Sequence, residues 1–170
     1  MADKRLDLSR EPGGAHHLLA RLAGGWSGTT RTWFEPDQLA DQSPTRGRMR
    51  TVLDGRFVVH EYEGSLQAKP LFGMAVIGYH IDAGVFTVAW IDSFHMGTGT
   101  MQSTGRAAAD DDGTGFDVLG QYEVPEGPPW GWRTTLRLSD DDKLSIVHFN
   151  ISPAGDESKA VEIVYTREGV

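Results

Sequence analysis

Apolar and polar residues alternate with a period of two from Trp26 almost to the end of the chain, and this alternation limits the fold more than any other feature. Such a period is typical of β-strands with one buried face. An Asp-Gly pair, Asp54-Gly55, lies within the pattern. Asp-Gly favours a two-residue type I′ turn, because both central residues of that turn need a positive φ. The pattern therefore predicts a β-hairpin centred on residues 54 and 55.

The turn at residues 54 and 55 sets the register of the two strands around it. Met49 then faces His60, and on the opposite surface Arg48 faces Glu61, an opposite-charge pair that favours this register. The charged surface is expected to face water. Four residues are expected to point inward: Met49, Val58, His60 and Tyr62.

Ten segments combine this alternation with turn signals at their ends. They are residues 26–34, 46–53, 56–63, 70–80, 85–92, 98–107, 115–123, 130–138, 143–151 and 158–168. Consecutive hairpins without long crossovers favour an all-β fold, a single up-and-down antiparallel β-barrel, because closure removes the exposed strand edges.

The residues before the barrel are expected to form a short helix and a tail. Between Pro12 and Ala23, apolar residues recur at helical spacing, and the helix is expected to cap one open end of the barrel. Residues 1–10 are predicted to be a loose tail. Residues 11–170 are predicted to be one barrel domain.

Residues 70–92 are predicted to form a hairpin closed by a three-residue loop that ends at Gly84. Pairing Ile81 with Val85 produces two faces. The bulkier face is assigned to the interior and consists of Phe72, Met74, Val76, His80, Phe86, Val88, Trp90 and Asp92. The other face is also apolar and includes Leu71, Ala75, Ile77 and Tyr79. Because an exposed apolar surface of this kind usually marks association, strands 70–92 are predicted to contribute to a homodimer interface.

The last hairpin is centred on residues 152–156, where Gly155 closes a three-residue loop. This pairing aligns His148 with Ala160 and leaves two possible inner faces. The first consists of Leu144, Ile146, His148, Glu162 and Val164. The second consists of Val147, Phe149, Val161, Ile163 and Tyr165. The first is adopted for the candidate site, and the second is kept as the alternative.

These assignments predict a cavity with mostly apolar walls and a few polar groups, the usual pattern of a small-molecule site. The residues expected to line it are Met49, His60, Tyr62, Met74, Trp90, Asp92, Tyr122, His148 and Glu162. The predicted function is the binding of a small hydrophobic or amphipathic molecule inside the barrel. One alternative is an isomerase or cyclase that acts on a hydrophobic metabolite, with Asp92, His148 and Glu162 as its acids and bases. Another is a barrel packed solid by its own side chains that serves as a protein-interaction module.

Composition and local motifs exclude several other classes. The net charge of −8 disfavours polyanions, so nucleic acid is not an expected partner. The chain has no cysteine, which excludes disulfides and thiolate chemistry. Because no apolar run is long enough to span a membrane and the first residues lack the apolar core of a signal peptide, a cytoplasmic location is expected.

No metal site is predicted, because His16 and His17 are adjacent and metal ligands on a helix need i,i+4 spacing. Residues 93–99 contain Gly-x-Gly without a following helix, so no phosphate cradle is predicted there.

Residues Leu22–Gly28 combine the end of a short helix with Gly-x-Trp on the first strand, and this start resembles that of lipocalins and other calycins. In that superfamily an arginine of the last strand packs over the tryptophan at the closed end of the barrel. The resemblance therefore implies a structural cation–π pair between Trp26 and Arg167.

A longer set of motifs resembles a bacterial calycin-like family of unknown function. These motifs are Trp33-Phe34-Glu35-Pro36, Leu53-Asp54-Gly55-Arg56-Phe57, Glu61-Tyr62-Glu63-Gly64, Gly78-Tyr79, Trp90-Ile91-Asp92-Ser93 and Glu162-Ile163-Val164-Tyr165-Thr166-Arg167. The resemblance implies a lipocalin-like barrel and no established activity. The chain is also similar to haem-binding nitrobindin-type barrels, whose haem-ligating histidine lies near the C-terminus. Because no histidine follows His148, no cofactor is predicted, and haem is kept only as an alternative.

Overall fold

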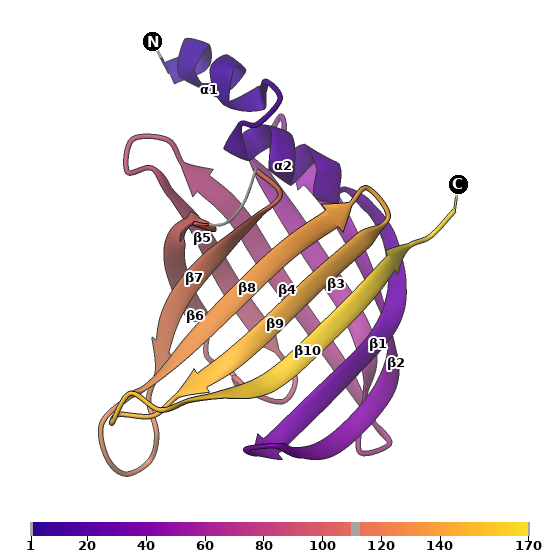
Figure 1. Ribbon diagram of the computed structural model, residues 1–170, viewed down its shortest axis with the longest axis vertical. Helices are drawn as coiled ribbons and strands as arrows, with labels where there is room; N and C mark the ends of the chain where they lie inside the picture. The colour runs from indigo at the N-terminus through magenta and orange to yellow at the C-terminus, as the bar shows by residue number, and fades with distance from the viewer. Residues whose placement is uncertain (1, 110–112, 170) are drawn as a thin grey trace.

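The computed structural model describes residues 2–109 and 113–169, and these ranges contain two helices and ten strands (Figure 1). The helices are α1 (Ala2–Arg10) and α2 (Ala15–Leu22). The strands are β1 (Gly24–Glu35), β2 (Gln38–Val52), β3 (Phe57–Leu66), β4 (Lys69–His80), β5 (Val85–Asp92), β6 (Met101–Ala107), β7 (Gly115–Tyr122), β8 (Trp130–Asp140), β9 (Lys143–Ile151) and β10 (Glu157–Arg167). All ten predicted strands are confirmed, although β2 begins at Gln38 and not at residue 46.

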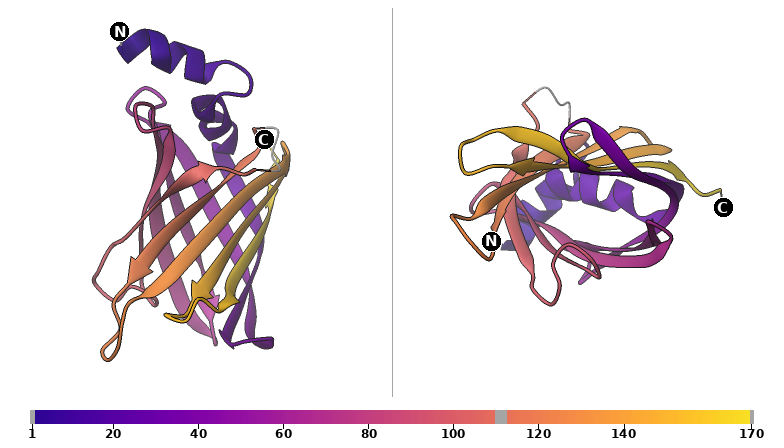
Figure 2. Two further views of the ribbon diagram at one scale, coloured as in Figure 1. Left: turned by 60° about the vertical axis from the view of Figure 1, so that its left-hand side comes forward. Right: turned by 90° about the horizontal axis from the view of Figure 1, so that it is seen from below.

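Each strand pairs antiparallel with its neighbours in the sequence, and β1 pairs with β10 to close the barrel (Figure 2). The predicted up-and-down antiparallel barrel is therefore confirmed. Closure gives every strand two hydrogen-bonded neighbours, so no row of backbone N–H and C=O groups is left open to solvent or to another chain.

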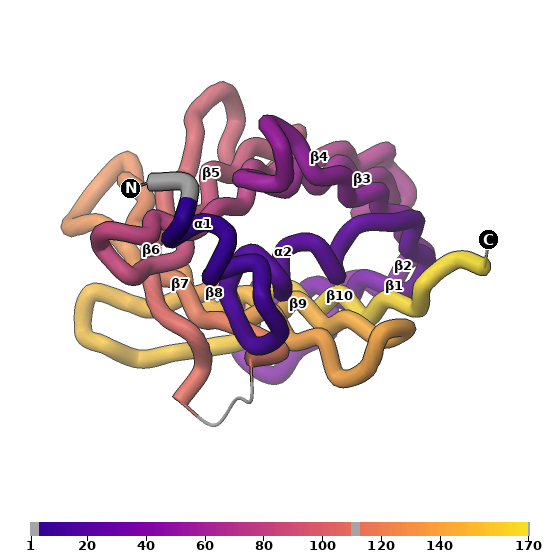
Figure 3. Tube along the Cα trace, turned by 90° about the horizontal axis from the view of Figure 1, so that it is seen from above, coloured from indigo at the N-terminus to yellow at the C-terminus, as the bar shows by residue number. Residues whose placement is uncertain are grey.

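Helix α2 lies across one end of the barrel, the upper end in Figure 1, and Figure 3 shows it from above. Its buried residues are His16, Leu18, Leu19 and Leu22. They recur at helical spacing and form one face, and the three leucines belong to the same hydrophobic core as the strands. The predicted capping helix is confirmed. In the part of the chain that the structure describes, no helix is long and apolar enough to cross a membrane.

The predicted loose tail at residues 1–10 is a helix over most of its length, α1. Leu6 is buried, and Arg10 binds the carboxylate of Asp54 in the β2–β3 hairpin at 2.9 Å. Arg5 binds Asp82 in the β4–β5 hairpin. The prediction was wrong because α1 has no apolar stripe of its own. It is held by the two distant hairpin loops and by His16 of α2, whose Nδ1 lies 2.8 Å from the Ser9 hydroxyl.

The β2–β3 hairpin has the predicted register, with Met49 opposite His60 and Arg48 opposite Glu61. Asp54 and Gly55 have φ values of 56° and 73°, the positive values that the turn needs. Met49 and His60 are buried inside the barrel, as predicted.

The register predicted for the β4–β5 hairpin is wrong by one residue. His80 pairs with Val85, so the loop has four residues, Ile81–Gly84, and not three. Because side chains alternate between the faces of a strand, this shift turns the whole of β4 over. Leu71, Gly73, Ala75, Ile77 and Tyr79 face the interior, whereas β5 keeps its predicted inner residues Phe86, Val88, Trp90 and Asp92. The β4 residues of the apolar face that suggested a homodimer therefore belong to the inner wall of the barrel, whereas its β5 residues stay outside.

The last hairpin has the predicted turn but a different register beyond it. The amide N–H of Gly155 donates to the carbonyl of Ser152, and that of Ser152 donates to the carbonyl of Asp156. A β-bulge between Lys159 and Val161 then shifts the pairing, so that His148 faces Val161. The bulge turns the rest of β10 over. The predicted inner face is right for β9 and wrong for β10, which points Val161, Ile163 and Tyr165 inward.

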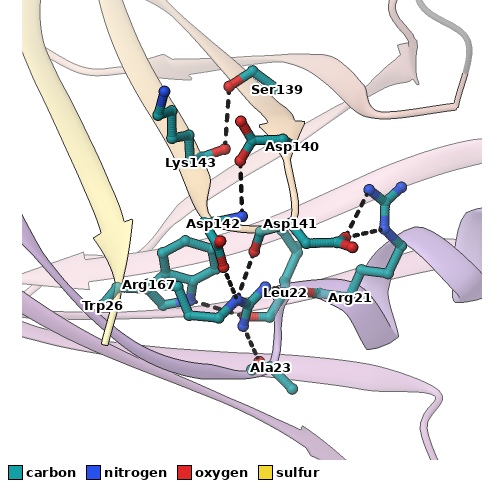
Figure 4. A network of polar contacts seen from close by, with 10 residues as sticks. All are labelled: Arg21, Leu22, Ala23, Trp26, Ser139, Asp140, Asp141, Asp142, Lys143 and Arg167. Atoms are coloured by element: carbon teal, nitrogen blue, oxygen red, sulfur yellow. Dashed lines mark hydrogen bonds and ion pairs between the residues drawn. The ribbon is translucent and has the colours of Figure 1, made fainter. Parts of the chain in front are cut away.

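Trp26 and Arg167 close the upper end of the barrel as the resemblance implied (Figure 4). The Arg167 guanidinium carbon lies 4.2 Å from the centre of the Trp26 ring. The same guanidinium donates hydrogen bonds of 2.6–2.7 Å to the backbone carbonyls of Arg21, Ala23 and Asp141. One side chain therefore ties β10 to the end of α2 and to the β8–β9 turn.

Candidate functional site

The lower half of the barrel, away from α2, brings together five of the predicted site residues. They are His60, Tyr62, Trp90, Asp92 and His148. They come from β3, β5 and β9, and Figure 2 shows this end of the barrel from below. The closed barrel places these strands around one interior, although they are far apart in the sequence.

Two small cavities of about 40 and 20 Å³ lie among these residues. Both are lined by Tyr62, Trp90, His148 and Ile163. A cavity that accepts benzene measures roughly 150 Å³, so the barrel is nearly filled by its own side chains. A tetrapyrrole such as haem is much larger than benzene and does not fit in this arrangement of side chains.

His60 is buried and lies against two tyrosines. Its Nε2 is 3.3 Å from the hydroxyl of Tyr165, and its ring centre is 5.0 Å from that of Tyr62. Gly47 makes this packing possible, because a Cβ there would lie 2.5 Å from the Tyr165 hydroxyl oxygen and 2.8 Å from His60 Nε2. Burial lowers the pKa of His60 to about 4, so the imidazole is neutral at pH 7.

Tyr62 of β3 lies across a glycine of β4 and receives a hydrogen bond from β5, the strand beyond it. The indole Nε1 of Trp90 donates to the Tyr62 hydroxyl at 2.8 Å. A Cβ at Gly73 would lie 2.0 Å from the Tyr62 ring, so only glycine leaves room for it. Burial raises the pKa of Tyr62, which keeps its hydroxyl protonated at neutral pH.

His148 stacks between aromatic rings deeper in the same cluster. Its ring centre lies 5.6 Å from that of Trp90 and 5.3 Å from that of Trp132, at interplanar angles of 13° and 25°. Its Nδ1 is 2.8 Å from the hydroxyl of Thr134. Burial, followed by the nearby His95 and His60, lowers the pKa of His148 to about 3. This imidazole is therefore also neutral at pH 7.

Asp92 binds a histidine that the sequence analysis did not select. The Asp92 carboxylate lies 2.5 Å from Nδ1 of His95 and accepts the backbone N–H groups of Phe94 and Met96. Burial by itself raises the pKa of Asp92, but the hydrogen bonds from His95 and the two amides outweigh burial and lower it. The Asp92 side chain has no exposed surface, and its carboxylate is ionised at neutral pH.

His95 comes from the loop between β5 and β6 and turns back toward the barrel. Its ring centre lies 5.6 Å from that of Trp90 and 5.9 Å from that of Trp132. The Gly-x-Gly of this loop was considered for phosphate binding and rejected, and the histidine before it was not selected. The informative signal was an aspartate at a strand end followed three residues later by a histidine, a spacing at which the carboxylate orders the loop by accepting its amides.

Trp132 of β8 is the second residue that sequence reasoning missed. Its side chain is packed among Trp90, His95 and His148, and the residue is 4% exposed. Among the described residues, its Nε1 is the one buried side-chain nitrogen or oxygen without a hydrogen-bond partner. Such an unpaired donor costs about 1–3 kcal/mol, and it is rare in folded proteins.

Four predicted site residues lie elsewhere. Met74 and Glu162 are on the outside of the barrel, because the registers of β4 and β10 differ from those predicted. Glu162 binds Arg31 at 3.2 Å. Met49 is buried but lines neither of the two cavities. Tyr122 is half-buried, and its hydroxyl donates to Oδ1 of Asn150. The predicted catalytic set therefore does not assemble, because Glu162 is separated from the other two members by the barrel wall.

Within the described ranges, no three histidine, aspartate or glutamate side chains are arranged to hold a metal ion. The cluster instead offers the neutral imidazoles of His60 and His148, one buried carboxylate, two tyrosine hydroxyls and one indole N–H without a partner among the described residues. This arrangement can hold a small molecule by ring stacking and by directed hydrogen bonds.

A family model described as a protein of unknown function, DUF1579, matches residues 11–167. The chain belongs to this family. No curated protein matches the chain. The result agrees with the resemblance to a calycin-like family of unknown function.

Two solved structures are similar to this barrel, and both similarities concern the fold alone. One is Rv2717c from M. tuberculosis, at 13% identity and a TM-score of 0.62, with 91% of this chain and 98% of that chain covered. The other is the S-type phycobiliprotein lyase CPES from Guillardia theta, at 13% identity and a TM-score of 0.59, with 91% and 92% covered.

Proposed function

We propose that this protein binds a small amphipathic molecule inside the lower end of its barrel. The observation that carries the proposal is the indole N–H of Trp132, which has no partner among the described residues and is buried beside the larger cavity and several polar rings. A bound hydrogen-bond acceptor would remove the energetic cost of that donor. The likeness to a protein named as a phycobiliprotein lyase is consistent with this proposal and concerns the fold alone.

The composition of the cluster also supports binding over simple packing. Three histidines and one aspartate surround the cavities. Burying these polar groups costs free energy, and apolar side chains of similar size would fill the barrel without that cost. Aromatic walls with a few directed polar groups are the usual lining of a small-molecule site.

The loop between β5 and β6 provides the route of entry in this proposal. It follows Asp92, the last residue of β5, and carries His95, and its Met96 packs against the barrel core. Methionine is unbranched and flexible, so its displacement enlarges the site at low cost. Gly97, with a φ of 58°, lies next to it and allows the loop to change direction. The polar end of the ligand would lie in the cavities and the remainder toward the lower end.

Calorimetric titration and native mass spectrometry with small aromatic rings, fatty acids and tetrapyrroles test this proposal. We expect a small ring compound to bind with micromolar affinity. Trp132→Phe should weaken this affinity by about tenfold, which corresponds to the loss of one hydrogen bond. Trp33→Phe is the matched control, because Trp33 lines neither cavity. Its ring centre lies 5.4 Å from Nζ of Lys159. Absence of binding across all three classes would refute the proposal and favour the solid-packed interaction module.

A homodimer through strands 70–92 and a cytoplasmic location both stay predictions. The outward residues of this region are not those first assigned, but they are again apolar: Phe72, Met74, Val76 and Ile91. Light scattering at micromolar concentration tests association, with Met74→Glu as the variant that should abolish it. A wild-type protein that is monomeric throughout would remove the prediction.

A further inference from the structure

Two phenylalanine rings meet at the lower end of the barrel. Phe34 of β1 and Phe94 of the loop between β5 and β6 have ring centres 6.1 Å apart, at an interplanar angle of 29°. Three strands, β2, β3 and β4, lie between β1 and β5 in the wall. Neighbouring strands are about 4.8 Å apart, so four spacings would separate the two rings by about 19 Å along the wall. The rings therefore meet across the opening and not along the wall.

The stacked rings cover the smaller of the two cavities. Thr30 and Thr32 of β1 line this cavity, and Phe34 follows two residues further toward the rim. His95 lines it from the other side, and its ring centre lies 4.9 Å from that of Phe94. Phe34 and Phe94 are 48% and 52% exposed. The Phe34–Phe94 stack therefore lies between this cavity and solvent.

Phe34 lies near the tip of the β1–β2 hairpin, at the lower end of the barrel in Figure 1. β10 pairs with β1 only as far as Thr32, and β3 pairs with β2 only from Arg46. The pairing of β1 with β2 shifts on both sides of Trp33, and such bulges bend a strand. Residues 34–39 are therefore a two-stranded ribbon with no third strand beside it in the described part of the chain. An isolated ribbon of this kind is at best marginally stable.

The base of this ribbon is anchored to the barrel wall. Trp33 lies against β10, with its ring centre 5.4 Å from Nζ of Lys159. The Asp41 carboxylate accepts the backbone N–H of Gln67, in the β3–β4 turn, at 3.0 Å. The tip itself is joined to the far side of the opening by the ring of Phe34. The ribbon can therefore bend at its base when that one ring contact is lost.

We propose that residues 34–39 form a flap over the lower opening and that the Phe34–Phe94 stack is its latch. Opening the flap moves Phe34 away from Phe94 and admits a molecule to an interior whose closed cavities are too small for one. Because both rings are about half-exposed, the latch buries less area than a core contact and opens at a lower cost. The inference rests on the proposed function for the molecule that enters, and on the contacts above for the motion itself.

Hydrogen exchange of the indole N–H groups, followed by NMR, tests the flap without any ligand. The Trp132 N–H is buried and has no partner among the described residues, so its exchange requires water to reach the interior. Phe34→Ala removes the latch and should speed this exchange by about fivefold, the effect expected of one stacked aromatic pair. Phe72→Ala is the matched control, because Phe72 is 55% exposed on the outside of β4, and it should leave the rate unchanged.

A second indole and a cross-linked variant separate flap opening from a general loss of stability. Trp26, at the upper end, donates its Nε1–H to the carbonyl of Leu22 at 2.9 Å, and its exchange should be equal in the wild-type protein and in Phe34→Ala. The chain has no cysteine, so the double variant Phe34→Cys, Phe94→Cys can be joined by a short bifunctional thiol reagent. Joining the two thiols should slow the Trp132 exchange by at least about fivefold relative to the same variant before the reaction.

Three outcomes would overturn the flap: an unchanged Trp132 rate in Phe34→Ala, an equal acceleration at Trp26 and Trp132, and no slowing when the two thiols are joined. An acceleration in Phe72→Ala as large as that in Phe34→Ala would overturn it as well. Failure of every ring, fatty acid and tetrapyrrole to bind would remove the proposed function and leave the exchange results, and with them the flap, standing.

Discussion

Lowering the pH from 7.5 to 5 is expected to destabilise this protein through two buried histidines, His60 and His148. In the folded state burial lowers the pKa of His60 to about 4 and that of His148 to about 3, from an ordinary value of 6.5. The unfolded chain therefore binds more protons than the folded chain between these values. Stability is full above about pH 7 and falls as the pH is lowered through 6.5.

The size of the effect follows from the two pKa values. Each histidine contributes about 1.4 kcal/mol per pH unit once the pH is well below 6.5, which integrates to about 2 kcal/mol between pH 7.5 and 5. The two together lower the free energy of unfolding by about 4 kcal/mol. With a urea m-value of about 2 kcal/mol/M, the midpoint of unfolding would fall by about 2 M.

Urea unfolding followed by far-UV circular dichroism at several pH values between 7.5 and 5 measures this slope. The double variant His60→Gln, His148→Gln should lose most of it, and the remainder is assigned to His16, whose pKa burial also lowers. The exposed His80, changed to Gln, is the control and should leave the slope unchanged. A wild-type change of less than about 1 kcal/mol, or an equal slope in the double variant, would show that these imidazoles take up protons in the folded state.

Three further predictions follow from single contacts. Gly73→Ala should lower the free energy of unfolding by about 1–3 kcal/mol, because the new Cβ displaces Tyr62, and near-UV circular dichroism should report the lost aromatic packing. Arg167→Met should lower it by about 2–4 kcal/mol in urea unfolding, since three carbonyl hydrogen bonds and the contact with Trp26 are lost. Glu162→Ala should change it by less than about 1 kcal/mol and leave ligand binding intact, because this carboxylate makes only outer ion pairs; a loss of binding would contradict its position.

The strands and turns could be predicted because their signals are local. Residues 54 and 55 select a turn type by their φ values, and the turn then sets the register of its two strands. The alternation of polar and apolar residues locates the remaining strands. Trp26 and Arg167 could be paired from opposite ends of the chain only because the motif around them resembles a known superfamily.

The candidate site was predicted in part, and its errors have one cause. A one-residue change in loop length at residues 81–84 moved Met74 outside, and a single bulge near Lys159 did the same to Glu162. Faces of strands depend on register, and one residue of error reverses every side chain beyond it. His60 and Tyr62 were placed correctly because the β2–β3 hairpin has the predicted register. Trp90 was placed correctly because the inner face was chosen by the bulky residues of β5, so the register error reversed only β4.

The chain's own pattern was sufficient for ten antiparallel strands, their order around the barrel and a capping helix, since each depends on neighbours along the sequence. The packing of the closed barrel was needed to bring His95 back onto Asp92 and to bury Trp132 without a partner. It was also needed to tie α1 to two hairpins. These contacts join residues from separate strands and loops, and their energies exist only once closure has removed water from the space between them.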